Sequence, residues 1–282
     1  MKLIITGACG HIGSYIAENV FKIPKIKKTI LVDNLKSNRH ASLFNNIKKN
    51  KLEFHLADLN DEKSLNKFKN IKYLIHCASM TNAEKSFGVE KEMYKNNINC
   101  LKTVIKYCKK NNVKLIHLSS TSVYGKQTDL VDEKCEKKLQ YTTFRFGTIS
   151  GVSRGIRFHT AVNKFCLNAA IDQDITVYKT ALNQYRPYLS VKDAFKTFKF
   201  CIEKNFFKRD IYNALSGNFT VNQILNKIRK YKKKIKIKFV DTAIMNQLSY
   251  HVDDSKLSSC GLKLSNKIDS DIKETINLLK NI

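Results

Sequence analysis

The feature that most constrains the fold of this chain is a short apolar stretch that runs directly into three evenly spaced glycines. Residues 2–5 read Lys-Leu-Ile-Ile, and the glycines that follow are Gly7, Gly10 and Gly13. Through and beyond this turn every fourth residue is apolar, at Ile12, Ile16 and Val20. This order predicts a strand, a tight turn and the start of a helix.

Such a turn presents backbone N–H groups at a helix N-terminus, where they can bind a pyrophosphate that side chains would otherwise hold away. A second apolar stretch at 29–33 ends in Asp33, which lies 20 residues beyond Gly13. At that spacing a carboxylate meets the ribose hydroxyls of an adenosine. The pattern therefore predicts a dinucleotide site, and the alternative is a structural glycine turn without a ligand.

Asp33 also bears on which dinucleotide is bound. A carboxylate at this point repels the additional phosphate of NADP, although Lys36 and Arg39 just downstream could offset part of that repulsion. NAD is therefore the predicted cofactor.

The bulk composition favours a folded cytoplasmic protein. Hydrophobic residues make up 43% of the 282 residues, no apolar run is long enough to span a membrane, and the chain starts with a strand rather than a signal peptide. The eight cysteines form no C-x-x-C pair and the histidines show no ligand spacing, so we expect neither disulfides nor a metal site.

The net charge of +27 raises the alternative of nucleic-acid binding. The excess is mostly lysine spread along the chain, and its densest run, 227–238, reads as a helix end followed by an alternating strand. No nucleic-acid-binding motif accompanies the charge. We therefore expect no nucleic acid as a partner, but a surface that attracts small anions.

Further apolar stretches alternate with helical patterns along the first half of the chain. Strands are expected at 52–56, 73–78 and 114–118, with a long helix at about 90–110. This alternation predicts an α/β fold with a doubly wound parallel sheet, whose ligands bind at the carboxyl ends of the strands.

A set of motifs at these strand ends carries a family resemblance: Thr6-Gly-x-x-Gly-x-x-Gly13, Asp33-Asn34, Asp58-Leu59, His76-Cys-Ala78, Asn97 and Ser119-Ser-Thr-Ser-Val-Tyr-Gly125. The chain resembles the extended short-chain dehydrogenase/reductases, specifically the NAD-dependent nucleotide-sugar epimerase/dehydratase family. The resemblance continues through 144–151, 186–193 and 254–261, so it covers nearly the whole chain.

The resemblance implies a Rossmann domain at 1–150 with a return segment at about 189–203, and a substrate lobe at 151–188 and 204–282. The implied cofactor contacts are Gly7, Cys9, Gly10, His11, Ile12, Gly13, Asp33, Asn34, Asp58, Leu59, Cys77, Ala78, Ser79 and Asn97. The implied substrate is a nucleotide sugar, and Arg186 and Asn163 are the residues expected to bind it. Gly147 stands where many relatives carry an asparagine.

The family's chemistry depends on a Tyr-x-x-x-Lys pair on the helix between the fifth and sixth strands. Residues 126–140 contain no such pair and are too few for a full crossover helix. Ser120 is retained as the implied hydroxyl-binding residue, and Tyr124 is the best substitute base. Because the lost helix also builds the family's dimer interface, the basis for a homodimer is weakened.

Two other patterns compete as catalytic sites. Tyr188-Leu-Ser-Val-Lys192 matches Tyr-x-x-x-Lys, but its context reads as a strand, which would not place the two side chains together. Gly151-Val-Ser-Arg-Gly155 matches the G-x-S-x-G of serine hydrolases, but no helix pattern follows Ser153 directly.

The sequence therefore predicts an NAD-dependent nucleotide-sugar epimerase/dehydratase whose catalysis is impaired. The alternative is a non-catalytic NAD-binding or sensor protein with the same fold.

Overall fold

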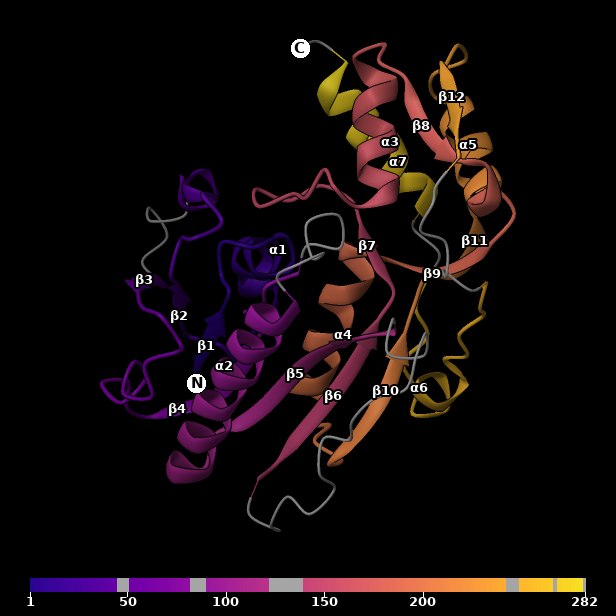
Figure 1. Cartoon of the computed structure of the whole chain (residues 1–282). Coiled ribbons are helices and arrows are strands. Elements are labelled where there is room, and N and C mark those ends of the chain that lie inside the picture. Colours follow the sequence, from indigo (N-terminus) through magenta and orange to yellow (C-terminus); the bar gives the residue numbers. More distant parts are fainter. Residues whose placement is uncertain (45–50, 82–89, 122–138, 242–248, 266–267, 281–282) are drawn as a thin grey trace.

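The computed structural model describes residues 1–44, 51–81, 90–121, 139–241, 249–265 and 268–280. Its centre is a seven-stranded sheet with the order β10-β6-β5-β4-β1-β2-β3, in which all neighbours are parallel (Figure 1). The strands are β1 (Lys2–Thr6), β2 (Lys28–Asp33), β3 (Leu52–Leu56), β4 (Ile71–His76), β5 (Lys114–Ser120), β6 (Tyr141–Phe146) and β10 (Asp210–Ala214). The predicted doubly wound parallel sheet is confirmed.

Helices cover both faces of this sheet. α1 (His11–Asn19) and α4 (Val191–Glu203) pack on one face, and α2 (Glu90–Asn111) lies on the other (Figure 1). Successive side chains of a strand point to opposite faces, so a strand that is apolar at every position must be covered on both. In β1, Leu3 and Ile5 join the core under α1 and α4, whereas Ile4 joins the core under α2.

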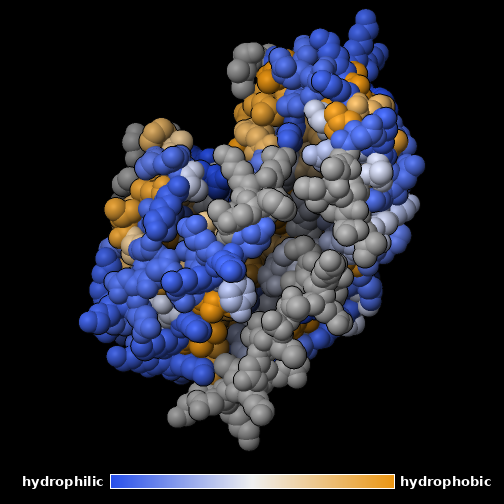
Figure 2. Space-filling view, in the orientation of Figure 1, coloured by the Kyte–Doolittle hydropathy of each residue, from blue (hydrophilic) through white to orange (hydrophobic). Residues whose placement is uncertain are grey.

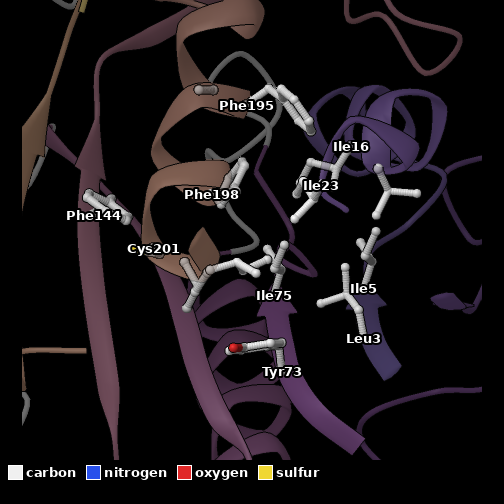
Figure 3. Packing of buried hydrophobic residues seen from close by; sticks show 14 of the residues in the cluster. Leu3, Ile5, Ile16, Ile23, Tyr73, Ile75, Phe144, Phe195, Phe198 and Cys201 are labelled. Atoms are coloured by element: carbon white, nitrogen blue, oxygen red, sulfur yellow. The ribbon is translucent and has the colours of Figure 1, made fainter. Parts of the chain in front are cut away.

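Figure 3 shows the core between α1, α4 and the sheet. Phe198 of α4 is fully buried, and its ring centroid lies 5.8 Å from that of Phe146 in β6. Ile16 and Ile75 are also fully buried in this cluster. Burying each such side chain contributes about 1.5–3 kcal/mol, so this core fixes α1 against the strands that precede and follow it.

The remaining elements form a smaller lobe, seen at the upper right of Figure 1. It contains a three-stranded sheet, β11-β9-β7, and a two-stranded sheet, β12-β8, with α3, α5 and α7 packed around a second apolar core. Its elements are β7 (Thr148–Ser150), α3 (Ala161–Ala170), β8 (Ile175–Tyr178), η4 (Lys179–Ala181), β9 (Tyr185–Ser190), β11 (Gly217–Thr220), α5 (Val221–Arg229), β12 (Ile237–Val240) and α7 (Ile268–Leu279). The short helices η1 (Val20–Lys22), η2 (His40–Leu43) and α6 (Ser255–Ser259) complete the described elements.

The chain returns to the large sheet over a longer segment than the predicted 189–203. After α4 has covered the sheet, β10 pairs with β6, so residues 210–214, which the prediction assigned to the lobe, form its seventh strand. This strand reads Asp-Ile-Tyr-Asn-Ala, which lacks the continuous apolar run of the central strands because it lies at the edge.

Three further predictions can be compared only with the described residues. Of the shortened connection at 126–140, only the last two residues are described. None of the helices in the described ranges is long and apolar enough to cross a membrane. The same ranges contain no group of three or more His, Cys, Asp or Glu side chains that could hold a metal ion.

Candidate functional site

The glycine turn between β1 and α1 is held in a conformation that only glycines permit. Gly7 has a φ of 68°, and a Cβ added there would lie 2.6 Å from the backbone nitrogen of Ala78. A Cβ on Gly13 would lie 2.2 Å from the carbonyl oxygen of Gly7. No side chain caps α1 at Gly10, so the partial positive charge of the helix N-terminus remains available to an anion.

Asp33, the last residue of β2, lies directly beside this turn. Its carboxylate accepts hydrogen bonds from the backbone N–H of Cys9, at 2.9 Å, and of Leu35, at 2.8 Å. Each carboxylate oxygen keeps further acceptor capacity, which suits a pair of ribose hydroxyls. Burial, and then the charge of Asp33, raises the pKa of Cys9 to about 11, so the Cys9 thiol stays protonated.

The carboxylate of Asp58, just after β3, is the second acidic group at this edge. Lys36 lies 2.9 Å from it, and the amide of Asn34 donates to it at 3.4 Å. Burial raises the pKa of Asp58, but hydrogen bonds from Asn60 and Lys36 outweigh burial and hold the pKa at about 2. Asp58 is therefore ionised and can accept from an amino group, while the adjoining Leu59 is buried.

A side chain of α2 holds the segment that follows β4. The Asn97 amide accepts from the backbone N–H of Met80 at 2.8 Å and donates to the Met80 carbonyl at 3.1 Å. Asn97 thereby orders the stretch that carries the other predicted contacts on this loop, Cys77, Ala78 and Ser79. The candidate cofactor residues thus lie at the carboxyl ends of the neighbouring strands β1 and β4. The strand order reverses between these two strands, so this is the topological switch point of the sheet.

The candidate catalytic residues divide between described and undescribed parts of the chain. Ser120 is the last residue of β5 and is exposed, whereas Tyr124 lies outside the described residues. Tyr188 is only 2% exposed, and burial raises its pKa to about 12, opposite to what a catalytic phenolate needs. The Lys192 ammonium instead bonds Glu274 and Ser270, so the Tyr188–Lys192 alternative lacks support from geometry.

The two predicted substrate contacts differ in their surroundings. Arg186 lies on β9 with its guanidinium carbon 5.1 Å from the ring centroid of Tyr250. Asn163 on α3 is fully buried, and its amide accepts from the N–H of Gly151 at 3.1 Å and donates to the carbonyl of Arg157 at 3.0 Å. Asn163 therefore shapes the 151–157 segment from within.

Residues 151–157 dock directly on the glycine turn, a contact that local sequence patterns do not reveal. A Cβ on Gly155 would lie 2.3 Å from the carbonyl oxygen of Cys9, and the Gly155 N–H donates to the Ser14 hydroxyl at 2.9 Å. The imidazole Nε2 of His11 lies 2.7 Å from the Gly151 carbonyl oxygen. The two glycines of the G-x-S-x-G pattern therefore serve packing and backbone geometry.

Ser153, the central residue of that pattern, is not placed as a hydrolase nucleophile. Its side chain is only 5% exposed, and α3 begins at Ala161 rather than directly after Ser153. The geometry of a nucleophile elbow, which exposes its serine at a strand-to-helix turn, is therefore not met.

Three buried polar atoms of this region have no hydrogen-bond partner among the described residues. They are Nδ1 of His11, Oγ of Ser153 and Nε of Arg157. Buried polar groups are normally paired, by protein, water or a ligand. The Ser153 hydroxyl and the Arg157 Nε–H are donors, and with the close-packed glycines and the uncapped helix they make the region fit an anionic group such as the pyrophosphate of NAD.

Comparison with known proteins agrees with this geometry. The family model described as "NAD dependent epimerase/dehydratase family" matches residues 3–140. UDP-N-acetylglucosamine 4-epimerase from Methanobrevibacter ruminantium M1, solved with UDP-N-acetylmuramic acid, superposes with a TM-score of 0.82 at 22% identity, over 100% of this chain and 99% of that one. This structural likeness confirms the fold.

Two curated relatives extend the comparison. The chain is 26% identical to the "Trifunctional UDP-glucose 4,6-dehydratase/UDP-4-keto-6-deoxy-D-glucose 3,5-epimerase/UDP-4-keto-L-rhamnose-reductase RHM1" of Arabidopsis thaliana, over 98% of this chain and 46% of that protein. It spans about half the length of several curated relatives that it matches. It is also 32% identical to the "Bifunctional protein GAL10" of Candida maltosa, over 46% of this chain and 88% of that protein. The chain therefore belongs to the NAD-dependent epimerase/dehydratase family, as its motifs predict.

Proposed function

We propose that this chain binds NAD together with a nucleotide sugar, and that it is a nucleotide-sugar epimerase/dehydratase of reduced catalytic power. The observation that carries the proposal is the joint placement of the glycine turn, Asp33 and the unpaired buried donors of Ser153 and Arg157 in one region. Relatives such as the UDP-glucose 4-epimerase of Schizosaccharomyces pombe and the dTDP-D-glucose 4,6-dehydratase of Dictyostelium discoideum support a nucleotide sugar as the substrate class.

The residues would divide the work by their chemistry. The turn from Gly7 to Gly13 would bind the pyrophosphate through backbone N–H groups, and Asp33 would accept from the adenosine ribose. NAD, when bound, accepts a hydride from the sugar carbon and can return it. Ser120 would hold the reacting hydroxyl, and Arg186 would bind the diphosphate of the sugar nucleotide.

The reduction in catalytic power follows from the missing tyrosine–lysine pair. A tyrosine phenol without a neighbouring cation has a pKa near 10 and is only about 0.1% ionised at pH 7. That deficit corresponds to about 4 kcal/mol relative to a fully ionised base. The second candidate function, an NAD-binding sensor without turnover, follows from the same observation. In either case we expect the protein to act in the cytoplasm.

One sample can test both functions. Titration calorimetry with NAD should detect binding, and incubation with UDP-glucose and dTDP-glucose, followed by chromatography of the sugars, should detect turnover. Turnover that Ser120→Ala abolishes and Tyr188→Phe preserves supports the enzyme. NAD binding without turnover of either nucleotide sugar supports the sensor, and the absence of NAD binding refutes both.

A further inference from the structure

Two arginines from distant parts of the chain, Arg39 and Arg157, lie beside the glycine turn. The Ser42 hydroxyl lies 2.9 Å from the carbonyl oxygen of Cys9 and 2.5 Å from that of Arg39, which holds Arg39 at the turn. Both arginines act electrostatically on the ring of His11, and Arg39 acts on Arg157. Arg39 also lies within the electrostatic range of Asp33. One arginine follows β2 and the other belongs to the 151–157 segment, so tertiary packing brings like charges together at the cofactor end of the sheet.

Neither guanidinium has an ion pair within 4.0 Å among the described residues. Arg157 donates one hydrogen bond to the carbonyl of Thr81, while its Nε is buried without a partner. Burial, and then the charge of Arg39, lowers the pKa of Arg157 to about 10. A partly buried cation beside a second cation is unfavourable unless an anion joins them.

We propose that Arg39 and Arg157 form a two-arginine clasp that binds the pyrophosphate of the dinucleotide together with the glycine turn. This inference rests on the proposed NAD binding and adds to it a contact from the 151–157 segment. A guanidinium presents a planar fork of donors that matches phosphate oxygens, and the pyrophosphate supplies two negative charges.

The position of Arg157 favours this assignment. Its segment is anchored to the glycine turn and α1, because Gly155 contacts the Cys9 carbonyl and its N–H donates to the Ser14 hydroxyl at 2.9 Å. Its guanidinium reaches Thr81 on the loop after β4, so the side chain crosses the switch point between β1 and β4. A dinucleotide spans that crevice in open α/β sheets.

A second diphosphate could in principle use the same clasp, namely that of the nucleotide sugar. Arg157 belongs to the segment whose Gly155 packs against the Cys9 carbonyl of the glycine turn, and the charge of Arg39 acts on it, so both arginines lie on the cofactor side. The two-arginine clasp therefore binds the cofactor. Separate titrations with the dinucleotide and with the uridine diphosphate distinguish the two possible diphosphates.

The test compares Arg157→Gln with Arg154→Gln, which removes a neighbouring arginine that already has Glu18 as a partner. Calorimetric titrations would use NAD, ADP-ribose and UDP. We expect Arg157→Gln to raise the Kd for NAD and ADP-ribose about 10- to 100-fold, as loss of a charge-assisted hydrogen bond predicts. Arg39→Gln should act in the same direction, and Arg157→Lys should recover part of the affinity because it keeps the charge without the fork.

Four outcomes would contradict the two-arginine clasp. If the wild-type protein binds neither NAD nor ADP-ribose, the proposed function fails with it. If the wild type binds both ligands and Arg157→Gln behaves like Arg154→Gln, the clasp alone fails. If Arg157→Gln weakens only UDP, the arginines serve the nucleotide sugar. A purely structural role would instead lower the Tm of the unliganded variant, whereas removal of an unpaired cation should leave that Tm unchanged or higher.

Discussion

The imidazole Nε2 of His11 lies 2.7 Å from the carbonyl oxygen of Gly151, which is 140 residues further along the chain. Because a carbonyl only accepts hydrogen bonds, Nε2 must carry the proton and Nδ1 must be bare. This tautomer agrees with the absence of a partner for Nδ1. The bond joins the first turn of α1 to the start of the smaller lobe. Figure 2 shows that the surface of the molecule is indented between its larger and smaller parts.

The burial of His11 should make stability depend on pH. Burial, and then the charges of Arg157 and Arg39, lowers the pKa of His11 to about 4 despite the Gly151 bond. The unfolded chain therefore binds more protons between about pH 4 and 6.5. The contribution of neutral His11 to the free energy of unfolding is therefore complete above pH 6.5, and it is lost as the pH falls through about 4.

The variant His11→Phe keeps a ring but loses the bond to Gly151. We expect it to lower the free energy of unfolding by about 1–3 kcal/mol at pH 7.5, because a buried carbonyl loses its donor. This loss of stability relative to the wild type should become smaller toward pH 4.5. Urea unfolding of both proteins at several pH values measures it. Equal deficits at every pH would contradict the prediction, and the exposed His40→Phe serves as the control.

Gly155 tests the docking of the 151–157 segment on the glycine turn. In Gly155→Ala the new Cβ would lie 2.3 Å from the Cys9 carbonyl oxygen and 2.6 Å from that of Gly10, so backbone must move. Overpacking of this kind costs about 1–3 kcal/mol. Thermal unfolding should show a lower Tm and calorimetry a weaker affinity for NAD. A variant that matched Arg154→Ala in both measurements would show that the segment is not held against the turn.

Asp271 is a fully buried carboxylate that joins α7 to two strands of the smaller lobe. It accepts from the hydroxyls of Ser150 at 2.7 Å and Ser190 at 3.1 Å, and Lys192 lies 3.8 Å away. Burial raises its pKa to about 6, although these groups act in the opposite direction. The folded protein therefore binds more protons than the unfolded chain between about pH 4 and 6, so this carboxyl favours folding at low pH and disfavours it at higher pH.

Asp271→Asn should remove this dependence while keeping the size of the side chain. Relative to the wild type, we expect the variant to gain stability as the pH rises from 4 to 8, by up to about 3 kcal/mol for a pKa difference of roughly two units. Urea unfolding at these pH values measures the gain. A constant difference between the two proteins would mean that Asp271 is not responsible.

Phe198 tests the core that fixes α1 beneath the cofactor region. It is fully buried, and Phe198→Ala should lower the free energy of unfolding by about 3–5 kcal/mol. Phe21→Ala removes the same atoms from a side chain that is 53% exposed, so it should change stability by less than about 0.5 kcal/mol. Similar losses for both variants in urea unfolding would place Phe198 outside the cooperative core.

Local spacing explains why much of the architecture could be predicted. The glycines at 7, 10 and 13 and the carboxylate at 33 belong to a strand–turn–helix–strand unit whose geometry depends on neighbours in the chain. The alternation of buried strands and helices similarly predicts a parallel sheet. By contrast, β10 was not predicted, because this edge strand is interrupted by Asp210 and Asn213 and lacks the continuous apolar run of its buried neighbours.

The amino-acid sequence alone determined the doubly wound sheet, the family and the NAD-type fingerprint, because each depends on residue spacing within short stretches. Only the tertiary structure decided that Gly155 contacts Cys9, that Arg157 lies beside Arg39, and that Tyr188 is buried away from the sheet edge. These relationships join segments more than a hundred residues apart or depend on which side of an element faces a core, and no local periodicity encodes either.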